Sequence, residues 1–499
     1  MRFYDIDTAL SEAIEKGTSP VRVRISLDWS GNGHVETVFE KDIIEASFTG
    51  LKEAAGGTTA RGEVLLDNTY GAYACGGTGS ANLGSGREVR ISFSVGDGLP
   101  YFERFVFFVD DKGFQDVRGP GRRVRLTLRD RAAVLRKTDE SRDWTMPSVF
   151  VYSLVCDKTQ PEKSLVHLIA QRAGLGVNDI DCATIPVSLP YARITKNVWA
   201  ELSELATAYR CHLECPVEKP LVFAHSPYQS EVFDVDEASY TFKGSDIFYL
   251  RFTECAEQYC NAVRLKINIP VALEKQEIWR YCDPPVVYNE YLTPRYPFRF
   301  PAIREIEKPG YEARYMVKDG DEDRAVIYAD SIDTQEEAEL RLGFDGGAFR
   351  YSAYDVTSHR DRAGITLHRD GDGDLYGAAI YGRPIVLDLN RSCFLKDTAA
   401  VMLRGTAALN VTGSYFSEDL IDGKPQYEDW AKRELAERLW DRREITVKTH
   451  RGVFHARVGA VVMVHTEEEM VRGTVNALSL RYKRGAAFVA EFRITEVSV

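Results

Sequence analysis

Apolar and polar residues alternate with a period of two through most of the first 140 residues. Examples are PVRVRISLDW (20–29), REVRISFSVG (87–96) and RRVRLTLRDRAAVL (122–135), and segments rich in glycine, asparagine or aspartate separate such runs. Alternation places every second side chain on one face of a sheet. The pattern therefore predicts strands of a barrel or sandwich.

The period changes to that of a helix between residues 164 and 210. SLVHLIAQRAGLG (164–176) has a serine at its start, apolar residues at helical spacing and Gly-Leu-Gly at its end, which are signals for the two ends of a helix. NVWAELSELATAYR (197–210) repeats the apolar stripe and leads into a predicted hairpin, CHLECPVEKPLVFAH (211–225). These elements predict a small α+β domain.

Strand patterns resume at NAVRLKINIPV (261–271) and return in residues 453–497. Between them, the segment KPQYEDWAKRELAERLWDRREI (424–445) has opposite charges four residues apart beside an apolar stripe. This pattern predicts a helix. The fold class is therefore mainly β with an α+β insert. The expected domains are a first strand domain at 1–140, the α+β domain at 141–248, a second strand domain at 249–350 and 441–499, and a peripheral insert with a hairpin and a helix at 351–440.

Net charge and hydropathy argue against two classes of protein, sequence-reading DNA binders and membrane-spanning proteins. The 499 residues include 63 Lys and Arg against 75 Asp and Glu, a formal net charge of -12, which repels nucleic acid and argues against a sequence-reading DNA binder. The longest apolar runs, at 105–109 and 458–464, are far shorter than the roughly 20 residues of a membrane-spanning helix. The first residues lack the pattern of a secretion signal, and the nine cysteines, an odd number, favour a reducing compartment. We expect synthesis in a cytoplasm and no membrane span.

The stretch HRDGDGDLYG (368–377) resembles a calcium loop. Asp370, Asp372 and Asp374 stand at alternate positions, as the first ligands of an EF-hand do. Leu375 and Tyr381, however, occupy the positions that require glycine and glutamate. We interpret the segment as an acidic hairpin tip rather than a metal site.

Cys211, Cys215, Cys255 and Cys260 are the strongest zinc candidates in the sequence. A structural zinc site uses four such ligands, but its paired cysteines are usually separated by two residues, against three and four here. Alternation along a predicted strand explains Cys211 and Cys215 as core residues. The hypothesis is that these four cysteines hold no metal.

No catalytic motif is recognisable: the sequence lacks G-x-S-x-G, H-E-x-x-H and S-x-x-K with its partner motifs. The acidic groups Asp110-Asp111 and 319–323 are interpreted as solvated turns. Four histidines lie on or beside predicted strands, where a surface or core role is expected: His359, His368, His455 and His465.

The glycine-rich connection at 70–87 contains Gly77-Thr-Gly79, but Asn82 stands where a nucleotide-binding motif needs its next glycine. We interpret it as a loop. The sequence therefore predicts no catalytic, cofactor-binding or metal-binding residues and a protein that is not an enzyme.

The order of these patterns resembles that of phage-type tail hub, or baseplate hub, proteins. Three segments carry the resemblance, namely the strand runs at 42–135, the α+β unit at 164–225 and the closing strands at 456–497. There are two departures. Phe107-Phe108-Val109 stands where the family has Phe-x-Gly, and Ala460 stands where the family usually has an acidic residue after a turn glycine.

The resemblance implies two barrels related to the tail-tube subunit, arranged so that three copies present six similar faces to a sixfold tube. It implies a structural hub in the virion tail, assembled in the host cytoplasm, that joins the tail tube to a central spike or fibre. The implied partners are two further copies of the chain, a tail-tube or distal-tail protein, and a spike or fibre protein. DNA would pass through the lumen without specific binding.

Two alternatives stay open. One is a sixfold distal-tail ring protein. The other is a carbohydrate-binding or cell-wall-cleaving tail protein, in which aromatic residues of the irregular stretch near 279–301 would form a platform for sugar; these are Trp279, Tyr288, Tyr291 and Tyr296.

Overall fold

The structure, a computed structural model, describes most of the chain. The described residues are 3–17, 19–27, 37–53, 57–71, 73–74, 81–82, 85–117, 121–137, 148–194, 196–225, 238–254, 259–272, 276–282, 316–319, 322–327, 339–345, 354–359, 362–368, 374–382, 385–413, 415–417, 420–421, 424–439 and 442–497.

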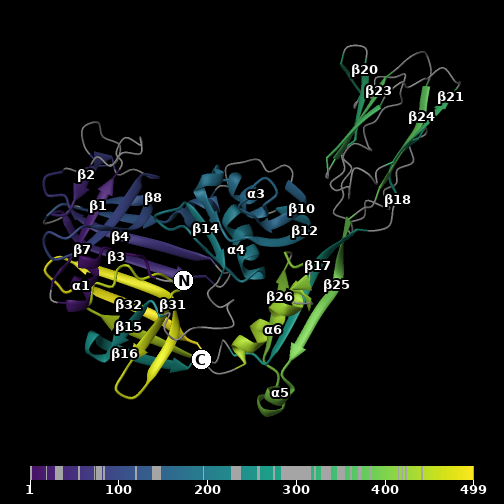
Figure 1. The fold of residues 1–499 in the computed structure, drawn as a ribbon. Helices are drawn as coiled ribbons and strands as arrows, with labels where there is room; N and C mark the ends of the chain where they lie inside the picture. Colours follow the sequence, from purple (N-terminus) through teal and green to yellow (C-terminus); the bar gives the residue numbers. More distant parts are fainter. Residues whose placement is uncertain are drawn as a thin grey trace.

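A sheet of 13 strands, the main sheet, forms the body of the molecule (Figure 1). Its strands are β1 (Val21–Leu27), β2 (Thr37–Phe39), β3 (Ile43–Lys52), β4 (Thr58–Asp67), β7 (Glu88–Val95), β8 (Phe102–Val117), β9 (Arg123–Arg129), β15 (Tyr240–Lys243), β16 (Ile247–Glu254), β29 (Arg443–Thr449), β30 (Val461–His465), β31 (Met470–Lys483) and β32 (Val489–Glu496). They are ordered β16-β29-β32-β31-β3-β4-β9-β8-β7-β1-β2, and β30 and β15 continue the sheet beside β31.

The first and last parts of the chain meet where β3 pairs with β31. The pairing is antiparallel, from Glu45 opposite Lys483 to Leu51 opposite Ala477. β31 reaches both parts because it is 14 residues long; it pairs with β32 along one edge and with β30 and then β3 along the other. The mainly β fold class is confirmed. The two barrels are not, because among the described strands the order stays open between β2 and β16.

One hydrophobic core covers this junction. Phe48 and Phe93 from the first part and Phe454 and Phe488 from the last part belong to the same buried cluster. The ring centroids of Phe93 and Phe454 lie 5.2 Å apart with the rings nearly parallel, and those of Phe93 and Phe488 lie 6.2 Å apart. We call these four residues the aromatic junction. They join the two ends of the chain into one folding unit.

Two short helices differ from the sequence expectations. α1 (Thr8–Lys16) was not predicted; the Asp7 carboxylate accepts the N–H of Ala9 at its start, and α1 buries Leu10 and Ile14 in the main core. The sequence 131–135 was interpreted as a continuing strand, which is wrong because β9 ends at Arg129 and α2 (Arg131–Lys137) follows. The Asp130 carboxylate accepts the Ala133 N–H at 3.1 Å, and this interaction favours the start of a helix.

The α+β insert lies beside the main sheet (Figure 1). It contains β10 (Ser148–Cys156), α3 (Leu165–Gln171), a 3-10 turn (Val177–Asp179), β11 (Ile180–Cys182), β12 (Ile185–Ile194), α4 (Val198–Ala208), β13 (Cys211–Glu214) and β14 (Leu221–His225). The predicted helices are confirmed, with Ser164 and Asn197 at their N-caps, and so is the antiparallel hairpin of β13 and β14.

A second hydrophobic core joins the insert to later parts of the chain. β17 (Ala262–Ala272) pairs with β25 (Ile385–Lys396) and β26 (Ala408–Gly413), and α6 (Gln426–Arg438) packs on this sheet. α6 confirms the late helix, although it ends seven residues before the predicted end at 445. The domain boundaries stay a prediction; β16 belongs to the main sheet, whereas β17 belongs to this second sheet.

The remaining strands at residues 276–382 form two small sheets that extend away from the body as an arm (Figure 1). They are β18 (Gln276–Cys282), β21 (Glu339–Asp345) and β24 (Asp374–Gly382) in one sheet, and β19 (Met316–Asp319), β20 (Glu322–Ile327), β22 (Tyr354–His359) and β23 (Arg362–His368) in the other. Shorter elements elsewhere are β5 (Tyr73–Ala74), β6 (Ala81–Asn82), a 3-10 turn (Gly244–Asp246), α5 (Thr398–Arg404), β27 (Leu420–Ile421) and β28 (Lys424–Pro425).

The acidic stretch 368–377 connects the two sheets of the arm. β23 pairs with β20 and β22, whereas β24 pairs with β18 and β21. The two strands that flank the stretch are therefore not paired with each other, and the hairpin expected there is wrong. Asp370 and Asp372 lie outside the described residues, so the expectation that they hold no calcium stays a prediction.

Candidate functional site

The cysteines considered for zinc lie on different elements. Cys211 is buried on β13, Cys215 follows that strand, and Cys260 is buried just before β17. Cys255 lies outside the described residues. The expectation that these four cysteines hold no metal stays a prediction.

The other sequence candidates are dispersed as well. Asp110 lies in an irregularity of β8 and pairs with Arg129 at 3.0 Å. Asp319 ends β19 and pairs with Glu322 at the start of β20; residues 320 and 321 lie outside the described residues, so the solvated turn at 319–323 stays a prediction. Trp279 lies on β18 opposite Ile380, while the three tyrosines of the suggested sugar platform and the Gly77-Thr-Gly79 loop lie outside the described residues.

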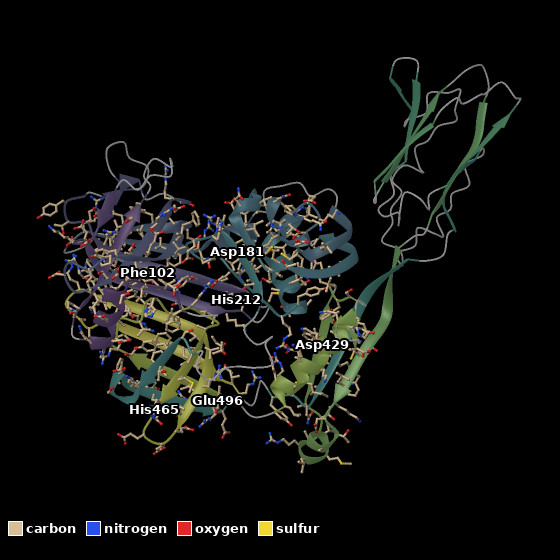
Figure 2. The ribbon with its side chains drawn as sticks, in the orientation of Figure 1. Phe102, Asp181, His212, Asp429, His465 and Glu496 are labelled. Carbon is tan, nitrogen blue, oxygen red and sulfur yellow. The ribbon has the colours of Figure 1, made fainter. Side chains whose placement is uncertain are left out.

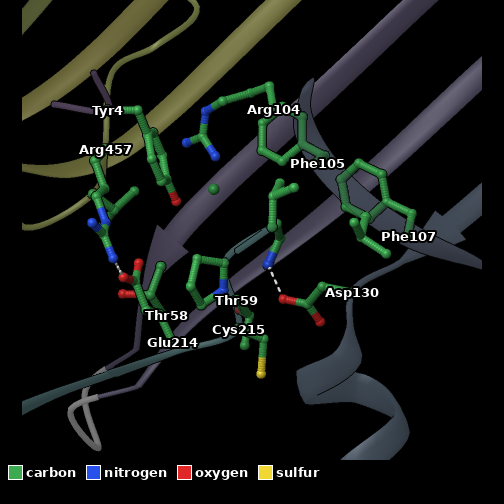
Figure 3. A pocket seen from close by; sticks show the side chains of 16 residues that line it. Tyr4, Thr58, Thr59, Arg104, Phe105, Phe107, Asp130, Glu214, Cys215 and Arg457 are labelled. Carbon is green, nitrogen blue, oxygen red and sulfur yellow. Dashed lines mark hydrogen bonds and ion pairs between the residues drawn. The ribbon is translucent and has the colours of Figure 1, made fainter. Parts of the chain in front are cut away.

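The structure instead gathers charged groups where the main sheet meets the insert. Tyr4, Arg104, Asp130, Glu214 and Arg457 line one pocket there (Figure 3), and we call them the charged junction. They come from the first residues, from β8, from the start of α2, from β13 and from the loop before β30. These residues are far apart in the sequence, so no local sequence pattern indicates that they form a group.

Arg104 is the most enclosed cation of the junction. Its Nε donates to the carbonyl oxygen of Phe454 at 3.0 Å and its Nη2 to that of Ala456 at 2.7 Å. The Tyr4 ring stands between the guanidinium groups of Arg104 and Arg457, at 4.6 Å and 4.7 Å from its centroid (Figure 3). Cation–π contacts and carbonyl acceptors replace part of the water that the buried charges lost.

Glu214 brings the insert into contact with the last part of the chain. Its carboxylate forms an ion pair with Arg457, and its other oxygen lies 3.2 Å from His212 Nε2. Burial, followed by the charges of Arg457 and Lys52, holds the pKa of His212 well below its usual range. His212 is therefore neutral, and Arg457 is the cation that balances Glu214. Figure 2 shows His212 where the insert meets the main sheet.

Asp130 occupies the other end of the pocket. Its carboxylate accepts the Ala60 N–H at 2.5 Å and the Ala133 N–H at 3.1 Å. Burial outweighs these hydrogen bonds and raises the pKa of Asp130 to about 6. Asp130 is thus a carboxyl group that gains its charge near neutral pH.

A neighbouring contact fixes α4 against the sheet. The Glu53 carboxylate accepts hydrogen bonds from Trp199 Nε1 at 3.2 Å and from Arg136. Gly57 permits this approach, because a Cβ atom at that position would lie 2.6 Å from the Trp199 ring. Burial raises the pKa of Glu53, but the hydrogen bonds from Arg136 and Trp199 outweigh it and lower the pKa overall.

The junction's chemistry suits packing rather than turnover. The cavity has a volume of about 50 Å³, whereas sites for small organic ligands usually enclose about 300–1,000 Å³. Glu214, Asp130 and Arg104 are each engaged by protein partners. The groups therefore orient the insert on the sheet and leave room only for water.

A second group of polar side chains lies inside the insert. Cys156 at the end of β10, His167 on α3 and Cys182 at the end of β11 place their sulfur and nitrogen atoms within 4.8 Å of one another, and all three are buried. The sequence analysis missed this group because ten and fourteen residues separate its members, so no local spacing marks it.

The whole chain was compared with known proteins. No protein-family model matches it, and no curated protein matches it. Solved structures do match over nearly the full length. The 43 kDa tail protein of prophage MuSo2 from Shewanella oneidensis is 10% identical, with 95% of this chain and 98% of that chain covered and a TM-score of 0.48.

Two further solved structures are similar. The tail protein from Neisseria meningitidis MC58 is 10% identical, covering 96% of this chain and 97% of that chain with a TM-score of 0.47. The prophage tail protein gp18 from Listeria monocytogenes EGD-e is 10% identical, covering 95% and 94% with a TM-score of 0.42. Each of these three structures is described as a tail protein.

None of the helices in the described part of the chain combines the length and the apolarity that a membrane crossing requires.

Proposed function

We propose that this chain is a structural protein of a phage-type tail and serves as its hub. In this role three copies form a ring that joins the tail tube to a central spike or fibre in the virion tail. The proposal rests on the order of sequence patterns together with the architecture of the main sheet. It assigns no catalytic residue, and the small cavity of the charged junction is consistent with that.

The observation that carries the proposal is the open main sheet. Strands from both ends of the chain form one continuous sheet through the pairing of β3 with β31. Among the described strands, β2 and β16 stand at the two ends of the longest strand order, and β15 ends the branch that starts at β31. A sheet with two free ends can pair head to tail with neighbouring copies, and such contacts close into a ring when the rotation permits. Two strand-rich regions per chain would then give six faces from three copies.

β16 has the surface expected of a strand that meets a neighbour. Phe248 and Tyr249 are 51% and 40% exposed, and the burial pattern of the strand is mostly exposed or intermediate. Burial of large aromatic side chains is a common source of interface energy. We therefore assign β16 to the contact between copies.

Substitution at this edge tests the proposal. Phe248→Lys with Tyr249→Lys places charges where a neighbouring strand would pair, and we expect the native mass to fall from that of a trimer to that of one chain. Tyr70→Lys is the matched control, because Tyr70 is 98% exposed in a turn away from β16. A trimer that survives the double substitution, or a wild-type chain that never assembles, contradicts the proposal.

The net charge of -12 suggests a use in this setting. Acidic groups facing the lumen would repel DNA and reduce its adhesion during passage.

The two alternative functions predict different experimental outcomes. Six copies per ring would indicate a distal-tail ring protein, and release of soluble fragments from purified cell wall would indicate a cleaving tail protein.

A further inference from the structure

The insert contains a compact set of metal-binding side chains that the structural role does not use. Cys156, His167 and Cys182 are the residues concerned, and in the described residues their ligand atoms lie within 4.8 Å of one another. They come from the ends of two strands and from the first turn of α3. A structural zinc site uses four ligands of these types, and this group supplies three of them.

We propose that Cys156, His167 and Cys182 bind a Zn²⁺ ion that fastens β10, α3 and β11 together. Zinc is bound by cysteine sulfur at about 2.3 Å and by histidine nitrogen at about 2.0–2.1 Å. Tetrahedral ligands at these lengths are about 3.8 Å apart or less, so the observed spacing needs only a small contraction. A water molecule or another group completes the fourth position.

The charges of the group fit this ion. Two thiolates neutralise the two charges of Zn²⁺, so the buried site as a whole carries no net charge.

The surroundings hold the ring in place. Ser164, the N-cap of α3, is fully buried, and its Oγ lies 2.7 Å from His167 Nδ1. Hydrogen-bonded partners of this kind orient histidine ligands in metal sites. Asp181, which precedes Cys182 on β11, is not part of the group, because it forms an exposed ion pair with Lys158 at 2.7 Å. No exposed carboxylate is needed for the site.

Metal analysis of the full-length chain tests the proposal. Protein purified with zinc and a reducing agent, without chelators, is expected to contain about one zinc ion per chain. Replacement by Co²⁺ is expected to give the visible and near-ultraviolet absorption of a cobalt ion bound by thiolates. Cys156→Ser and Cys182→Ser should lose most of the metal. Cys393→Ser is the matched control, because Cys393 is a buried cysteine of the same core outside the group, and it should retain the metal.

A measurement on the wild-type chain covers the case in which the variants do not fold. Bound zinc is expected to protect Cys156 and Cys182 from alkylation, and a chelator should remove the protection and lower the melting temperature. A chain that takes up neither zinc nor cobalt, equal metal loss in Cys393→Ser, or a Cys156–Cys182 disulfide in the reduced preparation would each overturn the proposal.

Discussion

The main sheet has two junctions with opposite chemistry. At the aromatic junction, phenyl rings from the first and last parts of the chain pack with centroids 5.2–6.2 Å apart. At the charged junction, ion pairs and carbonyl acceptors surround a cavity of about 50 Å³. Apolar burial stabilises by about 1.5–3 kcal/mol per large side chain, whereas a buried ion pair gains little net energy but is costly to break. The aromatic junction therefore supplies most of the stabilisation, and the charged junction fixes the orientation of the insert on the main sheet.

The largest effect is expected at the centre of the aromatic junction. Phe93 is fully buried and contacts rings from both parts of the chain. Phe93→Ala leaves a cavity there and should lower the free energy of unfolding by about 4 kcal/mol in denaturant titration. Tyr70→Ala, at a ring that is 98% exposed, is the control and should cost less than about 1 kcal/mol. Equal effects of the two substitutions would remove the distinction between core and surface.

Breaking one partner of the charged junction should cost somewhat less. Glu214→Met leaves the Arg457 guanidinium without its carboxylate, and we expect a loss of about 3 kcal/mol in the free energy of unfolding. The double variant Glu214→Met with Arg457→Met should recover much of that loss, because no unpaired charge remains. Losses that simply add in the double variant would show that the pair does not act as a unit.

Lowering the pH should destabilise the fold near the aromatic junction, because His455 becomes protonated. Its ring packs against Phe3 and Tyr240, and burial, followed by the charge of Arg104, lowers its pKa from 6.5 to about 4. Because the folded-state pKa is depressed, this stability is present above pH 6.5 and is lost as pH falls toward 4. Between pH 7 and pH 5 the loss should be about 2 kcal/mol. His455→Phe should flatten this part of the stability profile, and an unchanged slope would contradict the assignment.

Asp130 should respond to pH in the opposite direction. Its pKa is raised from 3.8 to about 6, so the stability it contributes is present below pH 3.8 and is lost as pH rises through 6. Between pH 5 and pH 7 this loss should be about 1 kcal/mol. Comparing the slopes of the wild type and Asp130→Asn isolates the effect, since an amide does not titrate. If stability falls more steeply with rising pH in Asp130→Asn than in the wild type, the predicted direction is wrong.

The periodicity of the sequence predicted several of the helices and strands. α3, α4 and α6 were found because their apolar residues recur at helical spacing, and the strands of the main sheet were found by alternation. α1 and α2 were missed; only Asp130 separates β9 from α2, so no turn signal marks the change from strand to helix.

The charged junction could not be predicted from local pattern. Arg104 and Phe105 are neighbours and both are buried, which strict alternation forbids. The cause is the register shift between β7 and β8, where Ile91 faces Phe105 and Ser92 faces Glu103. The partners of Arg104 lie about 350 residues away in sequence, at Phe454 and Ala456. Such contacts depend on tertiary folding.

A reconstruction of the assembled tail tests the central claim most directly. The account predicts three copies of this chain per ring, with the β16 edge of one copy beside the β2 edge of the next and with acidic side chains facing the lumen. Six copies per ring, free β2 and β16 edges, or a lumen lined mainly by lysine and arginine would contradict it.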